Sequence, residues 1–179
     1  MGFMKLKMVC MLLSLGLLTG CGYTTQNMLP PDVKTIHIPI FKNKTFKLEK
    51  IGRSFKREIE KKITDDVVEE FLEDASLRVV SDRGADWLLE GKVTQYETEP
   101  LRYSRSNSDI VEEYRVKITV ELKLTDIQQN KVLWDKEVIT QTKEFYVSGT
   151  ILDEEESALL QASERIAKDI FIQVMEGWY

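Results

Sequence analysis

The segment Tyr114–Leu124 alternates strictly between apolar and polar side chains, and this pattern restricts the fold more than any other part of the chain. Its apolar positions are Tyr114, Val116, Ile118, Val120, Leu122 and Leu124. Successive side chains of a strand point to opposite faces of a sheet. The segment therefore predicts a strand with one buried face and one face that is wet or covered by a partner.

Other segments predict the rest of a sheet. Strands are expected at 35–40, 77–80, 87–97 and 132–145, with a turn at 126–131. Within the first strand, Ile36, Ile38 and Ile40 share the expected buried face. Pro39 indicates an edge position or a strand end, because proline cannot donate a hydrogen bond to a neighbouring strand.

Two segments carry the periodicity of amphipathic helices. In 48–73 an apolar residue recurs at every fourth position: Ile51, Phe55, Ile59, Ile63, Val67 and Phe71. In 153–176 the apolar stripe consists of Leu159, Ala162, Ile166, Ile170 and Val174. Acidic residues 153–156 fall in the first turn, where negative charge interacts favourably with the helix dipole. Together these elements predict an α+β fold, a small mainly antiparallel or mixed sheet with two helices packed on one face.

The N-terminus has the form of a bacterial lipoprotein signal. Lys5 and Lys7 precede an apolar run of eleven residues, 8–18, which is too short to cross a bilayer as a helix. The run ends in Leu18-Thr19-Gly20-Cys21, which predicts cleavage before an acylated cysteine; the alternative is an ordinary secretory signal with a chance cysteine. We expect a cleaved signal peptide at 1–20, an acylated tether at 21–33 and a single domain at 34–179.

Charge and cysteine content exclude several functions. Loss of Lys5 and Lys7 leaves 23 basic against 30 acidic residues, a net charge of −7, which disfavours nucleic-acid binding. Cys10 leaves with the signal and Cys21 is consumed by acylation, so the mature domain has no other thiol. A diacylglycerol and an N-acyl chain on Cys21 would anchor the protein stably to a membrane.

Catalytic and metal-binding patterns are absent from the sequence. The single histidine, His37, lies in an expected strand without a recognisable nucleophile, and is interpreted as an ordinary strand-surface residue. Glycine-rich phosphate loops and His-based metal sites are also missing. We therefore expect no enzyme, no metal and no cofactor other than the lipid on Cys21.

Binding could involve the segment 98–113, which is sixteen residues long and separates two long strands. Long loops on a rigid sheet commonly carry function, and the alternative is a disordered excursion. Tyr103, Ser104 and Asn107 are candidate contacts with a partner. Cations in and beside this segment could form a patch for phosphate or carboxylate groups, or could merely keep a strand soluble. They are Arg102, Arg105, Arg115, Lys117 and Lys123.

The order of several short motifs resembles the LptE family of lipopolysaccharide-assembly lipoproteins over nearly all of the mature chain. The motifs are Cys21-Gly22-Tyr23, Leu29-Pro30, Thr35–Phe41, Asn43-Lys44-Thr45, Ala85-Asp86, Leu89–Val93, Glu113–Val116, Leu133-Trp134 and, in the last helix, Ala158, Ala162, Ile166-Ala167 and Ile170. Each motif is short and mostly structural, so the resemblance depends on their spacing together with the lipoprotein start.

The resemblance implies two helices packed against a small sheet. It also implies a lipid-anchored protein on the periplasmic side of the outer membrane that plugs and helps assemble a large β-barrel, LptD, for lipopolysaccharide transport. Gly22, in place of the aspartate that retains such lipoproteins at the inner membrane, agrees with that location. Family members bind lipopolysaccharide through basic residues, for which the five cations above are candidates. The alternative is a periplasm-facing lipoprotein that binds a lipid or a transporter component outside any barrel.

Overall fold

The computed structural model describes residues 29–45, 58–81, 84–106, 109–148 and 151–177. Its elements in chain order are β1 Thr35–His37, β2 Lys42–Asn43, α3 Ile59–Asp74, β3 Arg78–Val79, β4 Trp87–Tyr103, β5 Val111–Asp126, β6 Lys131–Tyr146 and α4 Ile151–Glu176. The predicted signal peptide, the acylation site Cys21 and residues 48–57 of the first predicted helix lie outside the described residues.

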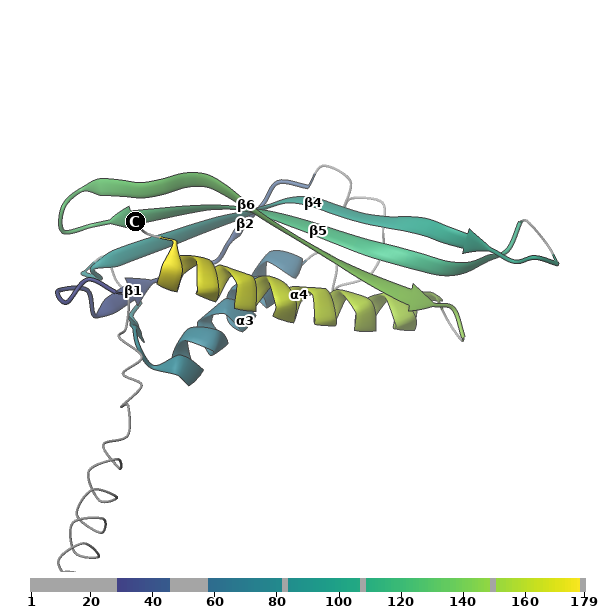
Figure 1. The fold of residues 1–179 in the computed structure, drawn as a ribbon, viewed down its shortest axis with the longest axis horizontal. Coiled ribbons are helices and arrows are strands. Elements are labelled where there is room, and N and C mark those ends of the chain that lie inside the picture. Colours follow the sequence, from purple (N-terminus) through teal and green to yellow (C-terminus); the bar gives the residue numbers. More distant parts are fainter. Residues whose placement is uncertain (1–28, 46–57, 82–83, 107–108, 149–150, 178–179) are drawn as a thin grey trace, which may run out of the picture.

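The strands form one mixed sheet in the order β3-β1-β4-β5-β6, with β2 also paired to β4. The short strands β1 and β2 run parallel to their neighbours, whereas β4, β5 and β6 form a long antiparallel meander. Both helices pack on the same side of this sheet (Figure 1). We call the opposite side the outer face. The predicted α+β fold with two helices on one face is confirmed.

The core lies between the sheet and the helices, and the predicted apolar stripes form it. Every apolar residue predicted to be buried in 114–124, except the half-buried Tyr114, is fully buried, as is the complete stripe of α4. In α3 the described members of the stripe are at most 1% exposed: Ile59, Ile63, Val67 and Phe71. Phe71 meets Phe171 of α4 edge to face, with ring centres 5.1 Å apart, and so joins the two helices.

The prediction of a sixteen-residue loop at 98–113 is wrong. β4 continues through Pro100 to Tyr103, and β5 begins at Val111, so the connection is residues 104–110. Proline is tolerated here because this end of β4 pairs only with β5 among the described strands, and a proline can occupy the side without a partner. Register shifts on both sides of Arg102 absorb the irregularity.

Pro39 ends β1 rather than marking an edge strand, because β1 lies between β3 and β4. The expected alternation therefore stops early. Ile36 and Ile38 are buried as predicted, whereas Ile40 is 65% exposed. The expectation that Ile40 faces the core is wrong because the residues after Pro39 no longer follow the geometry of β1.

Two contacts tie the N-terminal strands to β4. The ring of Phe41 covers Gly91, where an added Cβ would lie 2.5 Å from ring carbons. At the start of β4, one carboxylate oxygen of Asp86 accepts hydrogen bonds of 2.9 Å from the backbone amides of Lys34 and Thr35 and one of 2.8 Å from the Thr35 hydroxyl. Burial alone would raise the pKa of Asp86, but these hydrogen bonds together outweigh burial and lower it.

Candidate functional site

The outer face of the meander is polar along most of its length. On β5 the residues that alternate with the buried core positions point to it: Glu113, Arg115, Lys117, Thr119, Glu121 and Lys123. Their cross-strand neighbours on β4 and β6 are mostly charged or hydroxyl residues as well. Since both helices cover the other side, this face is the natural place to look for a site (Figure 1).

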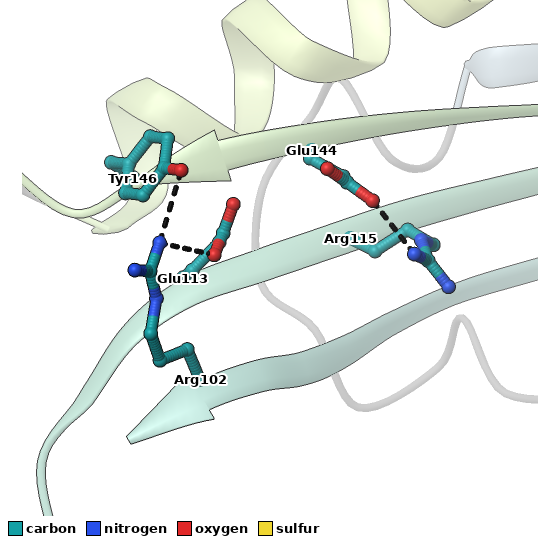
Figure 2. Close-up of polar contacts among 5 residues, drawn as sticks. All are labelled: Arg102, Glu113, Arg115, Glu144 and Tyr146. Carbon is teal, nitrogen blue, oxygen red and sulfur yellow. Dashed lines mark hydrogen bonds and ion pairs between the residues drawn. The ribbon is translucent and has the colours of Figure 1, made fainter. Parts of the chain in front are cut away.

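A compact cluster occupies the end of the β4–β5 hairpin. Arg102 donates hydrogen bonds to Glu113, at 2.6 Å, and to the Tyr146 hydroxyl, at 3.0 Å (Figure 2). The guanidinium carbon also lies 5.3 Å from the centre of the Tyr146 ring, within the range of a cation–π contact. The hydrogen bond to Glu113 is the main cause of a raised pKa of Arg102. One candidate cation is therefore already paired within the protein.

The middle of the face contains a second ion pair. Arg115 donates a hydrogen bond of 2.7 Å to Glu144 of β6, and this bond raises the pKa of Arg115 (Figure 2). Lys117 lies opposite Glu97 on one side and Thr142 on the other. The cations of this region thus face carboxylates of neighbouring strands, an arrangement that keeps the face hydrophilic with little net charge.

Lys123 lies at the other end of the face, in a groove of about 440 Å³. The groove has a mixed charged lining: Lys42, Lys92, Lys123, Lys136, Glu90, Glu121 and Asp135. Within it Lys92 pairs with Glu121 at 2.8 Å, and the pKa of Lys92 is raised by that hydrogen bond and charge. The sequence did not reveal this gathering of lysines, because they come from four strand segments that are far apart in the chain.

The structure does not bring the five predicted cations into one patch. Glu113, the partner of Arg102, and Lys123 are ten residues apart on β5, a separation of about 33 Å at the rise of a strand. Arg102 and Arg105 lie at the hairpin end, Arg115 and Lys117 lie in the middle, and Lys123 lies in the groove.

Two of the three candidate partner contacts, Tyr103 and Ser104, lie at the hairpin end. Tyr103 is 50% exposed, and the Ser104 hydroxyl lies 3.0 Å from that of Ser106. Asn107 lies outside the described residues. The backbone amide of Ser104 donates to the carbonyl of Ile110 at 2.7 Å, which closes the connection tightly.

Sequence reasoning missed a buried carboxylate in the acidic start of α4. Glu155 is only 6% exposed and accepts hydrogen bonds from the Tyr96 hydroxyl, at 2.8 Å, and from Thr98, at 2.5 Å. Burial is the main cause of a raised pKa of Tyr96, to which the charge of Glu155 adds. Only its position in the helical period, four residues before Leu159 in the buried stripe, distinguishes Glu155 from its less buried acidic neighbours.

His37 has a structural contact. Its Nδ1 donates to the carbonyl oxygen of Val80 at 2.9 Å and so links β1 to the residue after β3. In the described part of the chain no three His, Cys, Asp or Glu side chains converge as a metal site would require. Over the same residues, no helix has the length and hydropathy to span a membrane.

The sequence and the structure were compared with those of known proteins. Over residues 33–174 the sequence matches the family model LptE, lipopolysaccharide-assembly. No curated protein matches the sequence. The structure is similar to that of an uncharacterized lipoprotein B from Nitrosomonas europaea, with 18% identity, a TM-score of 0.57 and coverage of 87% of this chain and 90% of that one. It is also similar to a protein from Xanthomonas campestris, with 14% identity, a TM-score of 0.55 and coverage of 82% and 86%.

At these identities the structural similarities establish the fold alone, and the family model carries the assignment. It covers 33–174, which is most of the chain. Its description is an assembly role and not a catalytic one, in agreement with the prediction that the protein is not an enzyme. The chain belongs to the LptE lipopolysaccharide-assembly family.

Proposed function

We propose that this chain is an outer-membrane lipoprotein that plugs an LptD-type β-barrel, helps it to assemble and supports the delivery of lipopolysaccharide. The polar outer face of the β4–β5–β6 meander carries this proposal. Barrels of the outer membrane have polar interiors, so a plug needs a large hydrophilic surface on a rigid body. The meander supplies such a surface, and its helices and core supply the rigidity.

The paired charges of the outer face suit contact with a wet barrel wall. Ion pairs such as Arg115–Glu144 are exposed and contribute little to stability in water. The charged groups of these pairs can therefore bind side chains of the barrel lumen instead, at a small cost in free energy. The lipid on Cys21 and the tether 21–33 would hold the domain at the periplasmic side of the outer membrane.

Contact with lipopolysaccharide is proposed at the two ends of the meander. Phosphate groups bind Arg and Lys most strongly where those cations are not already neutralised. Arg105 at the hairpin end and Lys123 in the groove make no ion pair within the described residues. Arg102 and Arg115 are weaker candidates because each forms an ion pair with a carboxylate of the protein. Lys117 lies opposite Glu97, and Lys123 lies opposite Glu90 and Asp135, without forming an ion pair among the described residues, so Arg105 is the strongest candidate.

The test is affinity purification of the acylated, tagged protein from gently solubilised outer membranes, with the copy number of the main partner determined. We expect one large β-barrel per lipoprotein. A photoreactive amino acid at Thr142, exposed on the outer face, should then crosslink to that barrel. The same label at Glu69, exposed on α3, is the matched control that reports how far the helical side is also enclosed.

Recovery of the lipoprotein alone, or with inner-membrane transporter proteins, would contradict the proposal. The second result would favour the alternative, a periplasm-facing module that binds a lipid or a transporter component outside a barrel. Crosslinks from Glu69 without any from Thr142 would contradict the role of the outer face while leaving the barrel partner in place.

A further inference from the structure

Strand β6 is the long open edge of the sheet. It pairs with β5 on one side, and no other described strand pairs with its second side. In an antiparallel strand about half of the backbone N–H and C=O groups point away from each neighbour. Sixteen residues of unpaired edge are a template for another strand, which natural proteins normally shorten or cover.

The charges along β6 are complementary to those of a second, antiparallel copy of the same strand. After a β-bulge at Lys136, the regular part of β6 contains three more charged residues, Glu137, Lys143 and Glu144. If a second β6 pairs antiparallel with Thr140 opposite Thr140, Glu137 of each copy comes opposite Lys143 of the other. A register shifted by two residues in either direction places Glu137 opposite Gln141 or Phe145 and abolishes both of these symmetric pairs.

Glu137 and Lys143 are suited to such a pairing in two further respects. Both point to the helical side of the sheet, since they lie opposite the buried residues Leu122 and Val116 of β5. Both are half-buried, and neither has an ion pair or a side-chain hydrogen bond within the described residues. Half-buried charges without partners are costly, so a partner across the edge would stabilise them.

Exposed apolar residues beside β6 also favour contact with a second copy at this edge. On the outer face Val138 is 56% exposed, and in this register it lies next to Thr142 of the other strand. On the helical side, Asp169 of α4 accepts a hydrogen bond from Gln141 and so lies under β6. Ile172, three residues later on the same side of α4, is 49% exposed.

We propose that two copies of this chain associate through β6, antiparallel about Thr140, to form one continuous sheet. The symmetric arrangement contains two Glu137–Lys143 pairs. This association goes beyond the proposed barrel function, because it concerns the chain before it binds a barrel. It can be tested without the barrel partner.

The decisive experiment uses two charge reversals, Glu137→Lys and Lys143→Glu, in the acylated protein in detergent. Each single reversal creates two like-charge pairs across the interface and should weaken the dimer about tenfold or more, as measured by sedimentation over a dilution series. An equimolar mixture of the two variants restores both pairs of opposite charge. We therefore expect the mixture to regain wild-type association as a heterodimer. Circular dichroism of each variant establishes that it is folded.

A symmetric crosslink tests the register independently. The mature chain has no cysteine other than Cys21, so Thr140→Cys introduces one thiol at the proposed two-fold axis. Cα atoms of directly opposed residues lie within disulfide range, so oxidation should give a covalent dimer, whereas Glu69→Cys on the exposed surface of α3 should give none. A wild-type protein that sediments as a single copy throughout, or a mixture no better than its components, would overturn the proposal.

Discussion

Arg102 and Glu113 are directly opposed in the β4–β5 ladder and share a hydrogen bond of 2.6 Å, which Tyr146 of β6 completes from the third strand. Three strands are thereby joined by side chains at the point where the hairpin leaves the body of the domain (Figure 2). The pair also means that Arg102 has a structural partner. Its mutation changes the hairpin as well as any ligand contact.

Exchange of the two charges separates these effects. Arg102→Glu places two carboxylates opposite each other and should lower the melting temperature slightly. The double variant Arg102→Glu with Glu113→Arg restores an opposite pair and should recover it. Thermal unfolding of the two variants and the wild type provides the measurement. A double variant no more stable than the single one would show that the pair does not hold the hairpin end.

Lipopolysaccharide affinity should depend more on Arg105 than on Arg115. Arg105→Glu removes a cation that has no carboxylate partner among the described residues, whereas Arg115→Glu removes one whose charge Glu144 already neutralises. Titration with lipopolysaccharide should show the larger loss for Arg105→Glu, and added salt should reduce the difference. Equal losses, or a larger loss at Arg115, would move the contact to the middle of the face.

Gly91 should tolerate no larger residue while Phe41 covers it. In Gly91→Ala the new methyl group meets the aromatic ring at 2.5 Å, and relief of this overlap should cost about 1–3 kcal/mol of unfolding free energy. Denaturant unfolding measures the loss. In a Phe41→Leu background the same substitution should cost clearly less, because the ring is absent. An unchanged cost in both backgrounds would assign the effect to the backbone and not to the contact.

Asp86 should make the domain sensitive to acid. Its pKa is lower in the folded protein than the ordinary value of 3.8, so its contribution to stability is complete above that value and is lost as the pH falls through the folded pKa. Asp86→Asn removes the charge and should cost about 1–3 kcal/mol at neutral pH. The difference from wild type should shrink below pH 3.8. A difference independent of pH would exclude the charge as its cause.

Acylation at Cys21 should decide where the protein resides. Cys21→Ser removes the thiol that carries the lipid and should shift the protein from the membrane fraction to the soluble periplasm. Mass spectrometry of the N-terminal peptide checks the modification directly. Retention of Cys21→Ser in the membrane fraction of cells that lack the barrel would point to another anchor.

The fold was largely predictable from the sequence because its core positions follow simple periods. The alternation of 114–124 and the stripe of 153–176 correspond to buried faces in the structure. Predictions failed where the three-dimensional arrangement of the strands, and not the periodicity of apolar residues, decides the structure. The strand predicted at 87–97 was expected to end before residue 98, yet β4 continues through Pro100 to Tyr103, and the proline is tolerated because one side of the strand is unpaired there among the described strands. The lysine groove and buried Glu155 depend on contacts between distant segments, and no local pattern encodes those.

The position of β1 has a mechanical consequence. The described strand nearest the predicted acylation site, β1, is inserted between β3 and β4, parallel to both, and the carboxylate of Asp86 holds the backbone at its start. Tension applied through the tether therefore reaches the middle of the sheet and loads both flanking strands together. A pull on the N-terminal segment is therefore shared between two neighbouring strands and the Asp86 hydrogen bonds, whereas an N-terminal strand at the sheet edge would share it with a single neighbour.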